Sequence, residues 1–340
     1  MREGVALTAF TERGRALAKR LADALGGSLC PEGQPLSNWT AERFPTCEAL
    51  IFVGAVGIAV RSIAPHIGSK TSDPAVVCVD ETGRWAIPIL SGHLGGANAL
   101  AHRIAAVTGG EAVVTTATDL NHLFAVDLWA KKQGMAVINP ERIKQVSAKI
   151  LRGEAVGIDC PYPLPCPAPE LIQRGAPGDV LVSYRAAETS ALQLAPRVLT
   201  LGIGCKRGTG AQTLEAAFSR FCAERRILPE AIEQAASIDV KRDEAGLLTF
   251  CASHDWPLAF YSAEELRDVP GDYTASPFVE NAVGVDNVCE RAAVRCAGGG
   301  LIEKKYACEG VTFALAERRA DYDWSWQDGE TVCDRDRPRR

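Results

Sequence analysis

The chain has 340 residues, of which 47% are hydrophobic and 23% charged, a composition that excludes disordered and fibrous classes of protein. Its formal charge of −5 argues against a general nucleic-acid binder, which needs a basic face. The sequence has no apolar run of about 18 residues and no secretory signal pattern at its start, so we expect a cytoplasmic protein without a membrane span. None of the twelve cysteines forms a C-x-x-C pair, which favours free thiols over disulfides or a zinc site.

The first part of the chain alternates short apolar runs, glycine-bearing loops and amphipathic helices. Leu17, Leu21 and Leu25 recur on one face of a predicted helix, and the turn residues 80–83 between two apolar runs predict a hairpin. The predicted elements are a strand at 5–10, a helix ending near Leu25, strands at 49–53, 76–79 and 85–90, a helix at 97–107 and a strand at 113–116.

The pattern weakens over 128–195, where strands are predicted at 135–138, 155–158 and 180–184. Alternating prolines at 160–169 exclude a helix and indicate an extended surface connection.

A new unit begins near Val198 with a strand that enters the loop 205–210 and then a helix. Thr209 with Gln212, and Ser262 with Glu265, have the spacing of capping boxes at helix starts. Closing strands are predicted near Ile302 and at 311–315, and the segment after Ala320 shows no periodicity.

This alternation predicts an α/β fold with several domains, built from mainly parallel sheets with flanking helices and glycine-rich strand-to-helix loops. We expect an N-terminal α/β domain at 1–127, a small central domain with a proline-rich loop at 128–195, a C-terminal α/β domain at 196–318, and a loosely ordered tail at 319–340.

Three loops place glycine where a strand is expected to meet a helix: 54–60, 91–98 and 202–210. Glycine allows a tight turn and close approach to a ligand, so that backbone N–H groups can bind oxyanions. None of the loops has the full dinucleotide or P-loop pattern, and Lys206 lacks the Gly-Lys-Ser/Thr ending, which argues against triphosphate binding. Glycine is also common in ordinary α/β turns, so both interpretations stay open.

His93 lies in the second loop, where a general base would be close to N–H donors; a capping or packing role is the alternative. Asp119 follows a predicted strand end and is either the orienting partner of His93 or a helix N-cap. Cys205, next to Lys206, is either a nucleophile or a packing residue, and packing is favoured because no base is identified. Asp286 is predicted to be an N-cap. The other four histidines have no metal-ligand spacing, so no metal site is expected.

The motifs GAVGIAVRSIAP (54–65), IPILSGHLGGANALA (87–101), VTTATD (114–119) and LGIGCKRGT (201–209) resemble the CbiG family. The segments 236–247, 260–266 and 283–290 are similar to its C-terminal part, and the match runs from about Ala49 to Ala316. The resemblance implies a cobalt-precorrin-5A hydrolase of anaerobic cobalamin synthesis. Such an enzyme opens the ring-A acetate δ-lactone of a cobalt-bound tetrapyrrole and releases the C20 two-carbon unit as acetaldehyde.

The resemblance assigns no catalytic residues, so the expected site comes from the sequence. His93 is the expected base, Asp119 its partner, and the amides of Gly92, Gly95 and Gly96 the oxyanion donors. The candidate substrate-binding residues are Gly54, Gly57, Arg61, Ser91, Gly92, Gly95, Gly96, Asn98, Gly202, Gly204, Lys206 and Arg207. No cofactor is expected, because cobalt is carried by the substrate. Other corrin-pathway enzymes are candidate partners, and the alternative function is a non-catalytic carrier of corrinoid intermediates.

Overall fold

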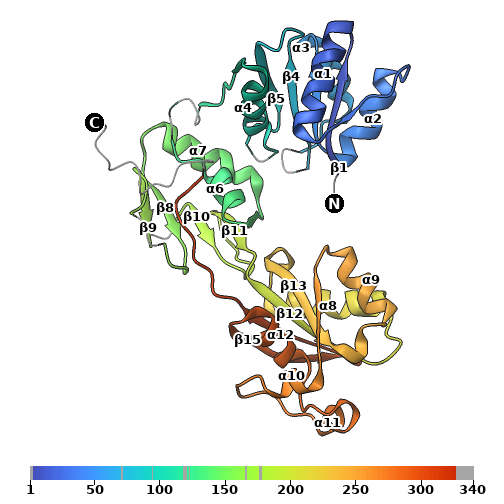
Figure 1. Ribbon diagram of the computed structural model, residues 1–340. Coiled ribbons are helices and arrows are strands. Elements are labelled where there is room, and N and C mark those ends of the chain that lie inside the picture. Colours follow the sequence, from blue (N-terminus) through green and yellow to red (C-terminus); the bar gives the residue numbers. More distant parts are fainter. Residues whose placement is uncertain are drawn as a thin grey trace. The chain divides into compact units, whose positions relative to one another are not determined.

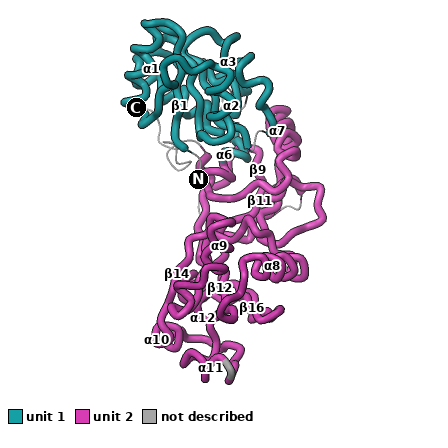
Figure 2. Tube along the Cα trace, turned by 90° about the vertical axis from the view of Figure 1, so that its right-hand side faces the viewer, with its two compact units in different colours: residues 1–128 teal, residues 129–340 magenta. Residues whose placement is uncertain are grey.

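The computed structural model describes residues 3–69, 72–93, 95–117, 121, 123–164, 167–175 and 178–326. The chain divides into two compact units, Met1–Leu128 and Trp129–Arg340, which Figure 2 colours separately. Over these described ranges, the first unit contains one sheet and the second contains two. The α/β fold class expected from the sequence is confirmed: the sheets are mixed, with mainly parallel pairings taken together, and carry flanking helices. The domain boundaries at 127, 195 and 318 stay a prediction.

The first unit is a six-stranded sheet with the order β2-β1-β3-β4-β5-β6 (Figure 1). Its strands are β1 (Glu3–Ala9), β2 (Ser28–Leu29), β3 (Cys47–Val53), β4 (Ala75–Val79), β5 (Trp85–Leu90) and β6 (Glu111–Ala112). Its helices are α1 (Glu12–Leu25), α2 (Leu36–Thr46), α3 (Val56–Ile63) and α4 (Ala97–Thr108), and α6 (Val126–Lys132) begins at its end.

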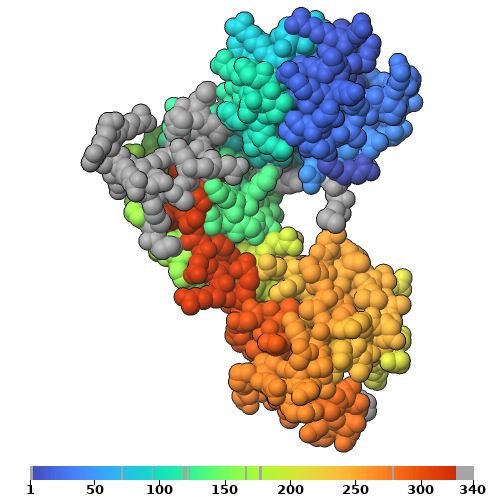
Figure 3. All heavy atoms as spheres, viewed as in Figure 1, coloured from blue at the N-terminus to red at the C-terminus, as the bar shows by residue number. Residues whose placement is uncertain are grey.

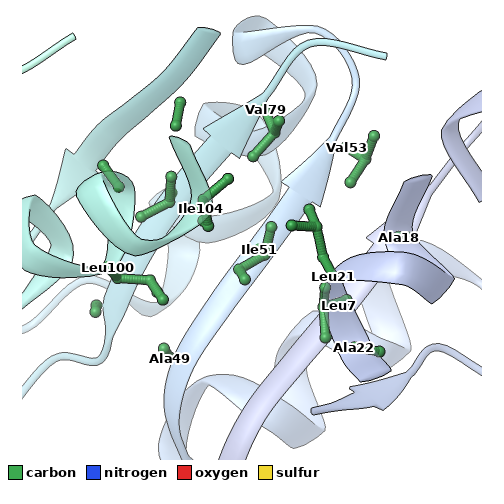
Figure 4. Packing of buried hydrophobic residues seen from close by; sticks show 14 of the residues in the cluster. Leu7, Ala18, Leu21, Ala22, Ala49, Ile51, Val53, Val79, Leu100 and Ile104 are labelled. Carbon is green, nitrogen blue, oxygen red and sulfur yellow. The ribbon is translucent and has the colours of Figure 1, made fainter. Parts of the chain in front are cut away.

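The two faces of this sheet are covered by different helix pairs. Alternate strand residues point to opposite faces, so Leu7 and Ile51 pack with Leu21 of α1 and Ile104 of α4 (Figure 4). Phe52, on the other face, packs with residues of α2 and α3. The expected helix stripe of α1 is confirmed, since Leu17 and Leu21 are buried and Leu25 packs against the same cluster.

Strand directions in this sheet matter for the loops. Strands β1, β3 and β4 are parallel, and the predicted hairpin is confirmed because β5 runs antiparallel to β4, with Val76 opposite Leu90. The strand expected at 113–116 is wrong: β6 ends at Ala112, and a single further bond from the Val113 N–H to the Ala86 carbonyl oxygen continues the pairing.

The second unit begins with a five-stranded sheet of order β7-β11-β10-β8-β9, parallel except for β7. Its strands are β7 (Met135–Val137), β8 (Val156–Asp159), β9 (Ile172–Arg174), β10 (Val180–Val182) and β11 (Leu192–Pro196), and its helix is α7 (Ile143–Leu151). The connection from β8 to β9 carries the prolines. The expectation that this connection lies on the surface is wrong in part, because Tyr162 and Leu164 are buried.

The C-terminal sheet has the order β14-β13-β12-β16-β15, and β12, β13 and β14 are parallel. Its strands are β12 (Leu199–Cys205), β13 (Ile232–Ile238), β14 (Leu258–Tyr261), β15 (Gly300–Cys308) and β16 (Val311–Glu317). Its helices are α8 (Ala211–Arg225), α9 (Ala245–Ser253), α10 (Ala263–Arg267), α11 (Pro277–Val283) and α12 (Cys289–Ala297). Phe218 of α8 contacts Phe250 of α9 and Phe313 of β16, whereas α12 packs on β12.

At the helix starts of this sheet, one predicted cap is confirmed and two are wrong. The capping box of Ser262 and Glu265 is confirmed. That of Thr209 is wrong, because its hydroxyl donates to the Lys206 carbonyl oxygen at 2.7 Å and α8 has no side-chain cap. Asp286 is not an N-cap either: it accepts a bond from Arg291, and Asn287 accepts the Glu290 N–H.

The segment that follows β16 is packed rather than loose. Tyr322, Trp324 and Trp326 are buried, and Trp324 stacks on Trp129 with ring centroids 5.5 Å apart. The Trp129 indole N–H donates to the Asp323 carbonyl oxygen at 2.7 Å. In Figure 3 this red segment lies beside green residues of the same unit. The expectation of a loose tail is therefore wrong up to residue 326, and 327–340 lie outside the described residues.

Candidate functional site

The two glycine loops of the first unit lie at opposite ends of the strands of its sheet. Gly54 follows the carboxyl end of β3, and its N–H donates to the Val79 carbonyl oxygen at the carboxyl end of β4. Ser91 follows β5, which is antiparallel and pairs Leu90 with Val76 near the amino end of β4. The loops 54–60 and 91–98 therefore do not form one cluster of N–H donors.

The loop between β5 and α4 is unusually compact. Ser91 has a positive φ of 56°, a conformation that costs a non-glycine residue of the order of 1–3 kcal/mol. A Cβ on Gly95 would lie 2.3 Å from the Ser91 Cβ, and a Cβ on Gly92 would lie 2.8 Å from the Asn98 Oδ1. Glycine is required at both positions because the chain doubles back on itself.

Much of the N–H capacity of this loop is used internally. The Gly96 N–H donates to the His93 carbonyl oxygen at 2.9 Å, and the Ala97 and Asn98 N–H groups donate to the Ser91 and Gly92 carbonyl oxygens. Gly96 is therefore wrong as an oxyanion donor. The N–H groups of Gly92 and Gly95 have no acceptor within the described residues and stay candidates.

His93 is held against a carboxylate. Its Nδ1 lies 3.2 Å from Oδ2 of Asp127, which is in the first turn of α6. The two side chains are 13% and 10% exposed, so water screens this pair only partly. When Nδ1–H donates to a carboxylate, Nε2 is the basic nitrogen of the ring. An imidazole oriented by a buried carboxylate has the geometry that a general base needs, and the catalytic role of His93 stays a prediction.

The carboxylate partner was expected at Asp119, which lies outside the described residues. Asp127 was missed, although the sequence held a signal for it. It is the one acidic residue in the run 123–130, whose other members are apolar, and a carboxylate on an otherwise buried face needs a partner.

Ser91 and Asn98 have structural contacts. The Ser91 hydroxyl donates to the Asp73 carbonyl oxygen at 3.3 Å, and the Asn98 amide donates to the Thr116 hydroxyl at 3.1 Å. The second bond joins the start of α4 to the segment that follows β6. Both contacts support the His93 loop, and substrate binding by these two side chains stays a prediction.

Gly54, Gly57 and Arg61 belong to the opposite end of the strands and to α3. A Cβ on Gly54 would lie 2.6 Å from the Phe10 ring, so this glycine makes room for an aromatic side chain. Gly57 is in the first turn of α3, and Arg61 reaches back to its carbonyl oxygen at 3.5 Å. These residues are apart from the His93 loop, and their role in binding stays a prediction.

In the C-terminal sheet, Gly202 and Gly204 lie within β12 and not in a loop. A Cβ on Gly202 would lie 1.8 Å from the Cys289 carbonyl oxygen, and one on Gly204 would lie 2.5 Å from the Thr312 hydroxyl. Each glycine is needed for close packing within the fold, and substrate binding by these two residues stays a prediction.

The loop that follows β12 is held by a buried carboxylate. Glu244 accepts the Gly208 N–H at 2.8 Å and a bond from Lys241 at 3.1 Å, and its Oε1 lies 3.7 Å from the Arg207 Nε. These groups, the Gly208 N–H first, lower the pKa of Glu244. Arg207 is thus partly engaged, whereas the exposed Lys206 has no ion-pair partner among the described side chains.

Cys205, at the end of β12, is half-buried, and the packing role favoured from the sequence stays a prediction. Burial raises the pKa of its thiol more than the charge of Lys241 lowers it, so little thiolate is present at neutral pH. No group of three or more metal-ligating side chains occurs in the described part of the chain. Within the same part, no helix has the length and apolarity that a membrane crossing demands.

Comparison with known proteins adds the family. Family models described as cobalamin synthesis G N-terminal, cobalamin biosynthesis central region and cobalamin synthesis G C-terminus match residues 38–119, 124–208 and 199–316. Proteins named cobalt-precorrin-5A hydrolase from Salmonella typhimurium and Priestia megaterium are 34% and 31% identical to the chain. The first alignment covers 92% of this chain and 97% of the relative, and the second 80% and 79%.

A solved structure of a cobalamin biosynthesis protein G homologue from Sulfolobus solfataricus is 22% identical, with a TM-score of 0.39, and the match covers 93% of this chain and 97% of that one. The three family models together span the chain from residue 38 to residue 316, and the relatives align with most of its length. The chain belongs to the cobalamin synthesis G (CbiG) family.

Proposed function

We propose that this protein is a cobalt-precorrin-5A hydrolase, which opens the ring-A acetate δ-lactone of its substrate and releases the C20 unit as acetaldehyde to give cobalt-precorrin-5B. The main support is the name shared by two relatives that align with at least 80% of the chain. The His93–Asp127 pair adds a group suited to water activation. Relatives with a hydrolase name favour catalysis over the carrier alternative.

The reaction consumes one water molecule. Water attacks the lactone carbonyl carbon, and the bond between this carbon and the ring oxygen breaks. The water oxygen stays in the ring-A acetate carboxylate, and the ring oxygen stays on C20 as a hydroxyl group. That hydroxyl then loses its proton while the bond from C20 to the macrocycle breaks. The bonding electrons return to the macrocycle, which takes up a proton, and C20 leaves with its methyl group as acetaldehyde.

In this scheme His93 removes the proton of the attacking water. Asp127 holds the imidazole with the proton on Nδ1, so that Nε2 is the accepting atom. A positioned base of this kind contributes about 10²–10⁴-fold to the rate. The Gly92 and Gly95 N–H groups are placed in the same loop and would donate to the developing oxyanion, each with an effect of about 10²–10³-fold.

Cobalt is part of the substrate in this proposal, and the protein supplies no resident metal or cofactor. The cytoplasm as compartment and contacts with other corrin-pathway enzymes stay predictions. The Arg61, Lys206 and Arg207 side chains stay candidate partners for substrate carboxylates.

The test is acetaldehyde release from cobalt-precorrin-5A by the purified chain and by its His93→Ala variant. We expect the variant to lose turnover while it still binds the corrinoid. His102→Ala is the matched control, because His102 is exposed on α4 of the same unit and should leave turnover unchanged. Binding without acetaldehyde release by the wild-type protein would instead identify a carrier.

A further inference from the structure

A pocket with a volume of about 560 Å³ lies beside α7 in the second unit, within the 300–1,000 Å³ typical of small-molecule sites. Its wall is formed by α7, the turn before it, and the starts of β10 and β11. The polar residues used in the argument below are Arg142, Lys144, Lys149, Arg152, Asp179 and Ser190.

The lining of this pocket is strongly basic although the whole chain is acidic. Four of its residues are cationic and one, Asp179, is anionic, which leaves a net charge of +3 by subtraction. The stripe Arg142, Gln145, Lys149, Arg152 has helical spacing along one side of α7, next to the side that carries the buried Ile143, Val146 and Ile150.

One of the cations is fixed in position. The Lys149 ammonium donates to Asp179 Oδ1 at 2.8 Å, and Asp179 Oδ2 accepts the Gly157 N–H at 3.0 Å. Arg152 pairs with Glu154, which does not line the pocket.

The two remaining cations have no anionic partner among the described side chains. Arg142 donates to the neutral Gln145 at 3.2 Å, and no ion pair involves Lys144. Both lie at the N-terminus of α7, whose first turn has no acidic residue. The helix dipole is positive at this end, so cations here are unfavourable for the isolated fold. A bound anion would remove this cost and would also interact with the N-terminal N–H groups.

We propose that this pocket binds the carboxylate groups of a polycarboxylate ligand, and that the ligand is the tetrapyrrole substrate with its acetate and propionate side chains. The second part rests on the proposed function. The chain has a net negative charge, so a polyanionic substrate must be held by local cations. The pocket concentrates four of them on one helix and its flanks. Ser190, exposed on the facing rim, adds a hydroxyl donor.

The test is calorimetric binding of two corrinoid probes to the full-length chain: cobyrinic acid, with free rim carboxylates, and dicyanocobinamide, with amidated ones. The double variant Arg142→Gln/Lys144→Gln removes the two unpaired cations. We expect its affinity for cobyrinic acid to fall about ten- to a hundredfold, since each charge-assisted contact accounts for about a tenfold change. Its affinity for dicyanocobinamide should not change.

The matched control is Lys19→Gln/Arg20→Gln, which removes two exposed cations of α1 and should leave both affinities unchanged. Equal cobyrinic acid affinity in wild type and the pocket variant would overturn the proposal. Citrate is titrated as a third probe: citrate binding as tight as that of cobyrinic acid, lost in the pocket variant, would reject the tetrapyrrole as ligand. Because binding is measured without turnover, failure of this proposal is distinguishable from failure of the hydrolase function.

Discussion

Replacing Asp127 by asparagine tests whether this carboxylate orients His93. The change keeps the size of the side chain and removes its charge. The Nδ1–Oδ2 distance of 3.2 Å exceeds the 2.7–2.9 Å of the strongest charge-assisted bonds. We therefore place the pair in the range of about 1.5–3 kcal/mol for hydrogen bonds to charged groups. At 1.36 kcal/mol per factor of ten, this predicts a kcat lower by about 10- to 150-fold.

The assay is steady-state acetaldehyde release by Asp127→Asn, by His93→Ala and by the double variant. Because Asp127 acts through His93, the double variant should be no slower than His93→Ala alone. KM should stay close to the wild-type value, and the exposed Asp23→Asn is the matched control. Losses that add in the double variant, or a wild-type kcat for Asp127→Asn, would refute this assignment.

Three further changes test the packing of the fold and one of its buried charges. Gly202→Ala should lower the melting temperature by several degrees, because the added Cβ would lie 1.8 Å from a backbone oxygen. Gly210→Ala is the control and should be tolerated, because its Cβ would point into open space. Equal melting temperatures of the two variants would contradict the packing role of Gly202. Trp324→Ala should cost about 3–5 kcal/mol in denaturant unfolding, as for large buried aromatic residues, because it removes the stack on Trp129; no loss would restore a loose tail. The pKa of Glu244 is lowered from its ordinary value of 4.5. Its charged form therefore stabilises the fold at pH values above 4.5, and this contribution is lost as the pH falls. Glu244→Gln should melt at a lower temperature than wild type at pH 7, and the difference should shrink toward pH 4. A pH-independent difference would contradict this.

Local patterns predicted much of the fold. The stripe of α1, the hairpin 80–83 and the Ser262 capping box are each set by residues a few positions apart, and the structure confirms them. Trp324 shows how such a pattern can be overlooked. Tyr322, Trp324 and Trp326 alternate with polar residues, and this spacing was itself a sign of a half-buried extended segment.

What could not be predicted at the site depends on tertiary contacts. The hairpin already implied that β5 runs against β4, and this direction places the His93 loop at the opposite end of the strands from Gly54. Glycine in a strand and glycine in a binding loop look alike in sequence, so the packing role of Gly202 needed the position of α12. The carboxylate of Asp127 is 34 residues from His93, and the pairing of two such residues depends on the fold.

The central claim, that water attacks the acyl carbon of the lactone, is tested most directly by turnover in water enriched in oxygen-18. Mass spectrometry of the corrinoid product should find one labelled oxygen, located in the ring-A acetate carboxylate. A corrinoid product without label would show that the bond between the ring oxygen and C20 breaks instead. It would contradict the roles given to His93 and to the N–H groups of Gly92 and Gly95.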